Sequence, residues 1–421
     1  MRINLENKLL HDPIYCSNIK KRNLFAIIEY MIRTVKNVYH LLTGIISLLW
    51  FRFPGRELTV IGVTGTDGKT TTTTLIYHIL KKAGIQASMI TSVHAVVAGK
   101  TYDTGFHVTT PNAFYIQKYL REAVDHGDTH MALEVTSHGI DQHRVFGIPF
   151  RVGVITNVTH EHLDWHGTFT QYLKTKMSLL EQSHIAIVNM DDKNVYAQGL
   201  KLLTKNSVIT YGMNKDADVT PKTFPFTTKL PGVFNQYNCL AAIGAAKALS
   251  IDSVIIRKAV ADFSGVTGRM EVMYKKDFTV IVDFAHTPNA ITQVLSTVRP
   301  IVKGSLIHVF GSAGLRDPFK RPLMGKASSE FADMIVLTEE DYRTEELETI
   351  MDEIQKGISP KKEVHRIPNR TQAIRFAIEK AKKGDLVIFT GKGHEKSLCR
   401  GTTEYPWSDQ EEVRKILQNI S

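Results

Sequence analysis

The stretch that decides the fold is "VIGVTGTDGKTTTTTLIYHIL", which runs from Val60 to Leu80. An apolar run predicts a β-strand over residues 58–64, and helical spacing predicts a helix that begins near Thr70. Between them, Gly65 and Gly68 permit backbone angles that other residues avoid, so the chain can turn sharply. Backbone N–H groups in such a turn, at the positive end of a helix dipole, bind phosphate oxygens.

The turn itself is predicted to be a variant nucleotide-binding loop. Lys69 would reach the terminal phosphates, and the Thr70 hydroxyl would ligate a magnesium ion. The usual P-loop pattern has a glycine where Val63 stands, so an ordinary strand-to-helix turn is the alternative. The strand before the turn and the amphipathic helix after it favour the nucleotide loop, which comprises Gly65, Thr66, Asp67, Gly68, Lys69, Thr70 and Thr71.

Length and composition limit the number of domains and the kinds of ligand that the chain can bind. The 421 residues predict two or three domains. An excess of 52 Lys+Arg over 42 Asp+Glu gives a net charge of +10, which suits anionic ligands such as nucleotides or a membrane surface but does not indicate nucleic acid. The three cysteines, Cys16, Cys239 and Cys399, fit no zinc spacing and suggest reduced thiols in a cytoplasmic protein.

The first 55 residues form a short basic and apolar segment that is predicted to be helical. Its stretch "VYHLLTGIISLLWF", from Val38 to Phe51, has no charged residue but is shorter than the ~20 residues that span a bilayer. It does not resemble a cleavable signal, because its apolar part starts late. Two alternatives remain open: the segment lies on an anionic membrane face, or it packs as a helix on the next domain.

After Arg56, strands and helices alternate, and this predicts an α/β fold with mostly parallel sheets. We expect a central P-loop-type domain over residues 56–266 and a C-terminal Rossmann-like α/β domain over residues 267–421. The predicted strands cover residues 58–64, 87–92, 130–135, 151–157 and 184–189 in the first domain, and 278–283, 305–310, 334–337 and 386–390 in the second.

Polar residues follow the predicted strands at one edge of the first sheet. Glu134 closes the strand "THMALEV", and His162 lies just beyond "VGVITNV". Both would lie near the phosphate loop, where a magnesium-bound triphosphate needs oxygen and imidazole ligands. Lys176 lies four residues after Tyr172 on one face of a predicted helix, where a lysine is ordinarily a solvated charge.

Ten motifs between about residue 56 and residue 400 occur in the order seen in the Mur ligases, and the chain resembles that family. The motifs are "GVTGTDGKTTT", "TTPN", "LEVTSHGIDQHRV", "TNVTHEHLDWHGT…YLKTKMSLL", "FNQYNCLAA", "GRMEV", "DFAHTPNA", "RDPFKRPLMG", "EDYRTEE" and "GKGHE". Within the family, the resemblance is strongest to the enzymes that add the third amino acid of the peptidoglycan stem peptide.

The resemblance implies a role for each matching residue. Lys69 contacts the ATP phosphates, and the residues that hold magnesium are Thr70, Glu134, His162 and a carbamylated Lys176. Other contacts to the nucleotide come from Asn235 and Asn238 near the adenine, Arg269 at the phosphates, Asp283 at the ribose, and His286 and Lys320 from the C-terminal domain. The muramoyl-peptide acceptor contacts Thr109, Thr110, Thr136 and Arg144. The incoming amino acid contacts Arg343, Gly391 and Glu395.

The expected reaction is ATP-dependent amide formation in cytoplasmic peptidoglycan precursor synthesis. The D-glutamate carboxylate of UDP-N-acetylmuramoyl-L-Ala-D-Glu would take the γ-phosphoryl group, and an amine would then attack the acyl phosphate. The motif "EDYR" departs from the Asp-Asn-Pro-Arg that is usual in diaminopimelate-adding enzymes. Because Arg343 and Glu395 together suit a zwitterionic end, meso-diaminopimelate is favoured over L-lysine.

Two further departures from the family pattern are visible, and two other functions stay open. The family's uridine-binding N-terminal domain is longer than the ~55 residues here, so a related ligase with another acceptor, such as a pseudomurein-type or folate polyglutamylating enzyme, is an alternative. Glu161 stands where the family usually has Asp. A non-enzymatic, nucleotide-dependent scaffold is the third possibility, although the intact Lys69, Glu134, His162 and Lys176 set argues against it. No heptad pattern is visible, so we expect a monomer.

Overall fold

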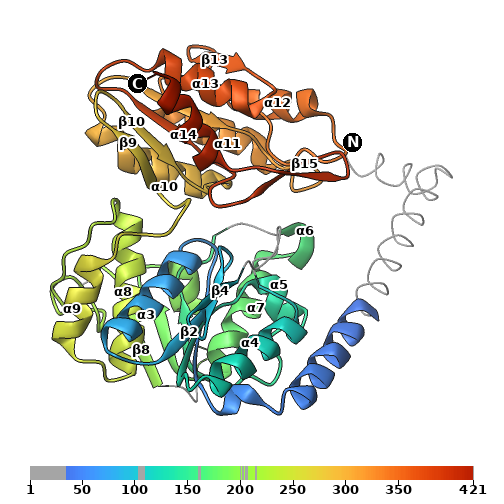
Figure 1. The fold of residues 1–421 in the computed structure, drawn as a ribbon, viewed down its shortest axis with the longest axis vertical. Helices are drawn as coiled ribbons and strands as arrows, with labels where there is room; N and C mark the ends of the chain where they lie inside the picture. Colours follow the sequence, from blue (N-terminus) through green and yellow to red (C-terminus); the bar gives the residue numbers. More distant parts are fainter. Residues whose placement is uncertain are drawn as a thin grey trace, which may run out of the picture.

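Two large β-sheets, each covered by helices, and one two-stranded hairpin form the part of the chain that the structure describes. The computed structural model describes residues 35–102, 110–159, 163–199, 201, 203, 207–213 and 216–420. Figure 1 shows the unit built on the second sheet above the unit built on the first. This arrangement confirms the predicted α/β class, with a mostly parallel sheet followed by a second α/β sheet.

The first sheet has eight strands in the order β4-β3-β2-β5-β1-β6-β7-β8. All neighbours from β2 to β8 pair in parallel, whereas β3 and β4 add an antiparallel hairpin at one edge. The strands are β1 (Thr59–Thr64), β2 (Ala87–Ile90), β3 (Ala95–Val97), β4 (Lys100–Tyr102), β5 (His130–Glu134), β6 (Phe150–Ile155), β7 (Ser183–Asn189) and β8 (Ser207–Tyr211). The central position of β1 places its carboxyl end in the middle of one sheet edge.

Alternate residues of β1 pack on opposite faces of the sheet, as the two-residue period of a strand requires. Ile61 and Val63 belong to one hydrophobic core, with α3, α8 and α9, while Val60 belongs to the other, with α4 and α7. The helices are α3 (Lys69–Lys82), α4 (Ala113–Asp125), α5 (Ser137–Asp141), α6 (Leu163–His166), α7 (Phe169–Glu181), α8 (Val233–Ala248) and α9 (Ser253–Asp262), with the short turns η1 (Pro54–Arg56) and η2 (Val195–Gly199).

The second sheet has six strands in the order β13-β12-β11-β14-β10-β9, and only β9 runs antiparallel to its neighbour. Helices α10, α11 and α12 pack on one face, and α13 and α14 on the other. The elements are β9 (Glu271–Lys275), β10 (Thr279–Val282), α10 (Pro288–Val298), η3 (Arg299–Ile301), β11 (Leu306–Phe310), α11 (Lys320–Phe331), β12 (Met334–Leu337), α12 (Leu347–Gln355), β13 (Glu363–Arg366), α13 (Arg370–Lys380), β14 (Leu386–Phe389), the hairpin β15 (Ser397–Arg400) and β16 (Thr403–Pro406), and α14 (Asp409–Ile420).

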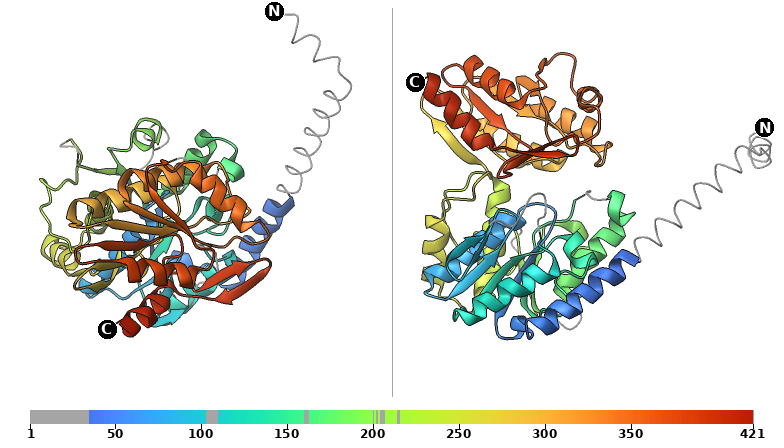
Figure 2. Two further views of the ribbon diagram at one scale, coloured as in Figure 1. Left: turned by 90° about the horizontal axis from the view of Figure 1, so that it is seen from above. Right: turned by 45° about the vertical axis from the view of Figure 1, so that its right-hand side comes forward.

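A helix over residues 35–50 precedes η1 and runs along the outer side of the first unit, as Figure 2 shows. Its buried face carries small residues and Leu48, which packs against Gly147. In the part of the chain that the structure describes, no helix is long and apolar enough to cross a membrane.

Candidate nucleotide and ligation site

A cavity of about 1110 Å³ lies where the two units face each other. The first unit lines it with the phosphate loop and the residues that follow β2, β5 and β6. The second unit contributes residues after β10 and β12, the start of α11 and the segment before β15. Clefts at the carboxyl ends of parallel strands are the usual ligand sites of α/β proteins, so this cavity is the candidate functional site.

The phosphate loop connects β1 to α3 and is fixed by two close approaches. A Cβ on Gly65 would lie 1.8 Å from the hydroxyl of Thr156, and one on Gly68 would lie 2.1 Å from Oδ1 of Asn238. Both glycines also have positive φ angles, of 145° and 81°. Side chains are therefore excluded at both positions, and Gly68 directly precedes the first residue of α3. Lys69 Nζ donates to the carbonyl oxygen of Thr66 at 2.7 Å.

Beside the loop, the hydroxyl of Thr70 meets the carboxylate of Glu134. Thr70 Oγ1 donates to the Glu134 oxygens at 3.0 and 3.1 Å, and the backbone N–H of Ser92 donates to the same carboxylate at 2.9 Å. Arg269 of the second unit reaches Thr70 Oγ1 from its Nη2 at 3.3 Å. A hydroxyl and a carboxylate are the hard oxygen ligands that Mg²⁺ prefers. Within the described residues, no group of three or more His, Cys, Asp or Glu forms a complete metal cluster.

Lys176 lies behind the loop and does not line the cavity. Its Nζ donates to the carbonyl oxygen of Gly65 at 2.6 Å and lies 4.5 Å from the centre of the Tyr172 ring. The side chain is only 1% exposed. The lysine that the sequence alone marks as an ordinary solvated charge is therefore buried against the backbone of the phosphate loop.

Asp67, in the phosphate loop, makes hydrogen bonds to a residue of each unit. Its backbone N–H donates to Asn157 Oδ1 at 3.0 Å, and its carboxylate accepts a hydrogen bond from Asn289 Nδ2, in α10, at 2.8 Å. The sequence did not single out Asn289 or Ser92. Ser92 follows β2 at the sheet edge where Glu134 ends β5, so the strand-end rule used for Glu134 was the available signal.

From the second unit, Arg269 and Asp283 enter the cavity wall. Asp283 accepts the backbone N–H groups of Met270 and Ala285, each at 2.7 Å, and burial raises its pKa although Arg269 opposes that shift. Burial lowers the pKa of Arg269, and its Nε has no hydrogen-bond partner among the described residues. An unsatisfied buried guanidinium N–H facing a cavity suits an anionic ligand.

Four further predicted nucleotide-site residues line the same cavity. Asn238 donates to Asn235 Oδ1 at 3.0 Å, and Asn235 in turn donates to the carbonyl of Pro231 at 2.8 Å. From the second unit, Lys320 Nζ donates to the carbonyl of His286 at 3.0 Å. These residues come from helices α8 and α11 and from the loop after β10, so both units contribute to one wall.

The predicted acceptor residues gather at another part of the cavity. Thr110 and Thr136 share a hydroxyl hydrogen bond of 3.1 Å, and Arg144 donates through Nη1 to the carbonyl of Thr110. All three line the cavity. Two predicted residues, Thr109 and His162, lie outside the described residues.

The predicted amino-acid end of the cavity is organised by a buried lysine that the sequence did not single out. Lys392 Nζ lies 2.8 Å from Asp341 Oδ1 and 2.5 Å from Glu395 Oε2, and its side chain has no exposed surface. Burial alone would lower the pKa of Lys392, but the two carboxylates outweigh it and raise that pKa. The charge of Asp341, the additional acidic residue of the motif "EDYR", is therefore compensated within the protein.

Glu340 and Gly391 meet beside this lysine. Glu340 is buried, burial raises its pKa, and its Oε2 has no hydrogen-bond partner among the described residues. A Cβ on Gly391 would lie 2.5 Å from that oxygen, so the close approach requires glycine. Both residues line the cavity, which leaves an unsatisfied acceptor there for a ligand N–H group.

Arg343 lies at the same end with a left-handed backbone, at φ 52°. Its Nη1 donates to the carbonyl of Gly314 at 2.6 Å, and its backbone N–H donates to the carbonyl of Cys399 in β15. A left-handed, non-glycine residue is strained, and such strain is common at functional sites.

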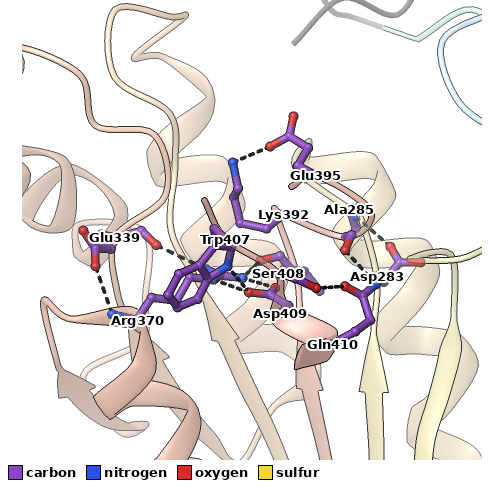
Figure 3. A network of polar contacts seen from close by, with 12 residues as sticks. Asp283, Ala285, Glu339, Arg370, Lys392, Glu395, Trp407, Ser408, Asp409 and Gln410 are labelled. Atoms are coloured by element: carbon purple, nitrogen blue, oxygen red, sulfur yellow. Dashed lines mark hydrogen bonds and ion pairs between the residues drawn. The ribbon is translucent and has the colours of Figure 1, made fainter. Parts of the chain in front are cut away.

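A buried polar network beneath this end holds the loops in place, and Figure 3 shows it. Arg370 pairs with Asp409 at 2.6 Å, with neither side chain exposed, and also donates to the carbonyls of Glu339 and Thr390. Gln410 donates to the carbonyl of Gly393 at 2.9 Å. The loops that carry Glu340 and Gly391 are thus tied to α13 and α14 by charge-assisted bonds.

A phosphate loop on one mostly parallel sheet that faces a second α/β sheet across a shared cavity is typical of a two-domain nucleotide-binding protein. The chain belongs to the Mur ligase family: residues 63–246 match the model of the Mur ligase middle domain, and residues 268–393 match the model of the Mur ligase glutamate ligase domain.

Similar proteins support this assignment. The chain is 39% identical over 386 residues to UDP-N-acetylmuramoyl-L-alanyl-D-glutamate-2,6-diaminopimelate ligase of Aquifex aeolicus, with 87% of this chain and 79% of that protein covered. It is 36% identical over 404 residues to the enzyme of the same name from Geobacillus kaustophilus, with 89% and 82% covered. A solved structure of a protein with that name is 30% identical in sequence and superposes with a TM-score of 0.59. The match covers 86% of this chain and 79% of the chain in that structure.

Proposed function

We propose that this chain is an ATP-dependent, ADP-forming carbon–nitrogen ligase of peptidoglycan precursor synthesis. It activates the D-glutamate carboxylate of UDP-N-acetylmuramoyl-L-Ala-D-Glu as an acyl phosphate and couples a diamino acid to it. The proposal rests on one cavity that three groups of residues share. They are the phosphate loop, the acceptor residues Thr110, Thr136 and Arg144, and the carboxylates Asp341 and Glu395 that pair with Lys392. An acyl transfer with three substrates needs three such adjoining subsites.

At the nucleotide end, Lys69 and Arg269 hold the phosphates. Lys69 Nζ lies at the loop, where it donates to the carbonyl of Thr66, and Arg269 has an N–H group without a partner among the described residues. Thr70 and Glu134 are proposed to hold magnesium, together with His162 and a carbamylated Lys176. When bound, that ion neutralises charge on the transferring phosphoryl group. Asp283, His286, Lys320, Asn235 and Asn238 complete the proposed ATP site.

At the acceptor end, Thr110, Thr136 and Arg144 are proposed to bind the muramoyl peptide, with Thr109 beside them. The hydroxyls of the two threonines already share a hydrogen bond, so they form one polar surface near the phosphate loop. Closure of the second unit over this surface would exclude water from the acyl phosphate.

At the amino-acid end, the arrangement favours meso-diaminopimelate over L-lysine. The guanidinium of Arg343 uses only Nη1 in hydrogen bonds with the described residues, so it can pair with the distal carboxylate of diaminopimelate. Glu340 and Glu395 offer carboxylate oxygens to the neighbouring ammonium group. Lysine has the ammonium group but no distal carboxylate.

Replacing Arg343 with alanine tests this choice of substrate. Because a hydrogen bond to a charged group contributes about 1.5–3 kcal/mol, kcat/KM for diaminopimelate should fall about 10- to 100-fold. The value for L-lysine should change less than about threefold, because lysine has no group that pairs with Arg343. Arg375→Ala, at an exposed position on α13, is the matched control and should change neither value. A tenfold preference of the unmodified protein for lysine would contradict the choice.

We further propose that the domains span residues 1–55, 56–266 and 267–421, and that the protein acts as a monomer in the cytoplasm. Lys20, Lys21 and Arg22 in the first segment, together with the exposed face of the following helix, support a peripheral contact with the inner membrane face.

The test of the function is phosphate release from ATP by the purified full chain with magnesium and UDP-N-acetylmuramoyl-L-Ala-D-Glu. Parallel reactions contain diaminopimelate, L-lysine or no amino acid, and the amide product is identified by its mass. We expect release that needs both acceptor and diaminopimelate. ATP binding without any turnover would favour a different carboxylate acceptor, as in a pseudomurein-type ligase, or a catalytically inactive scaffold.

A further inference from the structure

The outer face of the helix over residues 35–50 is an exposed apolar stripe. Six large apolar side chains on it are between 52% and 74% exposed: Val38, Tyr39, Leu42, Ile46, Leu49 and Trp50. Their spacings of one, three and four residues place them on one side of a helix. A soluble helix normally turns such a stripe toward the core, but here the opposite side, with Gly44, Ser47 and Leu48, contacts the first unit.

The stripe continues onto the neighbouring helix. Phe51 follows it directly and packs edge to face on Phe114 of α4, with ring centres 5.1 Å apart. Phe114 and Tyr115 are 42% and 48% exposed. Aromatic side chains at the edge of an apolar surface are typical of proteins that lie in the interfacial layer of a membrane. We call the six helix residues with Phe114 and Tyr115 the outer apolar face.

The charges around the outer apolar face have one sign along the helix. Residues 35–56 contain Lys36, Arg52 and Arg56 but no Asp or Glu. Lys36, Arg52 and Arg56 are all exposed. An apolar stripe with a cationic border complements an anionic lipid surface.

We propose that the outer apolar face docks on an anionic phospholipid bilayer and holds the enzyme at the membrane surface without crossing it. The inference rests on the proposed function in one respect, since a cytoplasmic ligase meets the inner leaflet, whose surface potential is negative. Apolar burial supplies the binding, and the basic residues make it selective for anionic lipid.

Vesicle co-sedimentation of the full chain tests the proposal. We expect binding to vesicles in which phosphatidylglycerol replaces part of the phosphatidylcholine, weaker binding to phosphatidylcholine alone, and weakening by salt. Leu42→Asp with Ile46→Asp should lower binding at least about tenfold, because two apolar side chains that would enter the bilayer are replaced by charged ones. Ile301→Asp, at an exposed apolar position on the second unit, is the matched control and should bind like the unmodified protein.

Two further measurements on the same samples separate the possible outcomes. Ligase turnover in solution should be unchanged in the double variant, so failure of membrane binding and failure of the proposed function are distinguished. Absence of vesicle binding by the unmodified protein, or equal binding by the double variant, would overturn the proposal. So would a dimer in sedimentation velocity that the double variant converts to a monomer, because the face would then join two copies.

Discussion

Replacement of Lys176 with alanine is expected to lower the turnover number by about a thousandfold, which is at the upper end of the loss from removing one preorganised charged group. The side chain is buried, and its Nζ is 2.6 Å from the carbonyl of Gly65 in the phosphate loop. Alanine removes the loop contact and also the amine that would carry the carbamate. The measurement is phosphate release under saturating ATP, acceptor and amino acid.

Lys174→Ala is the matched control, because Lys174 is exposed on the same helix two residues away. Its turnover should stay within about twofold of the unmodified protein. Thermal melting and nucleotide binding of Lys176→Ala must be measured as well, so that loss of the fold is not mistaken for loss of chemistry. Full turnover by Lys176→Ala would show that the reaction needs neither the loop contact nor a carbamate at this position.

A second pair of variants distinguishes a carbamate from a simple loop anchor. Lys176→Arg keeps the positive charge but cannot form the carbamate, so a carbamate role predicts that it is as inactive as the alanine variant. Added formate or acetate should then partly restore Lys176→Ala, because a small carboxylate replaces the missing magnesium ligand. Substantial activity in Lys176→Arg, without rescue of the alanine variant, would assign Lys176 to the loop alone.

The sequence predicts the long parallel elements closely because their apolar periods are strong. The strand predicted over residues 58–64 is β1 (Thr59–Thr64), and the one predicted over residues 334–337 is β12 without any shift. The sheet-edge strands β8, β9 and β13 and the hairpins β3–β4 and β15–β16 were not predicted. The hairpin strands have three or four residues, and β16 is exposed throughout, so no alternation of apolar and polar residues marks them.

The site was predictable where a local rule applied and not where distant loops meet. The strand-end rule predicts that Glu134 lies beside the phosphate loop, and it does, at 3.0 Å from Thr70. Asn289 reaches Asp67 only because the two units face each other across the cavity. Lys392 pairs with Asp341, 51 residues earlier, and no local pattern encodes that contact. Consequently the sequence shows the additional negative charge of Asp341 in "EDYR", but it does not show that Lys392 neutralises that charge.

The second large effect is expected at Glu134. Glu134→Gln keeps the shape and one amide oxygen that can accept from Ser92, but it removes the negative charge beside Thr70. We expect turnover to fall about 100- to 1000-fold, and the magnesium concentration for half-maximal rate to rise at least about tenfold, because a neutral amide is a weaker ligand than a carboxylate.

The magnesium titration separates this role from a structural one. If Glu134 only caps the N–H of Ser92, glutamine should serve nearly as well, and both the rate and the magnesium dependence should stay within about threefold. Ser92→Ala is the matched control, since it removes the 3.0 Å hydroxyl contact to Thr70 but leaves the backbone N–H and the charge of Glu134 in place. Each variant loses one contact to Thr70, but only Glu134→Gln also loses a negative charge. A shift in magnesium dependence in Glu134→Gln but not in Ser92→Ala therefore assigns magnesium binding to the Glu134 carboxylate.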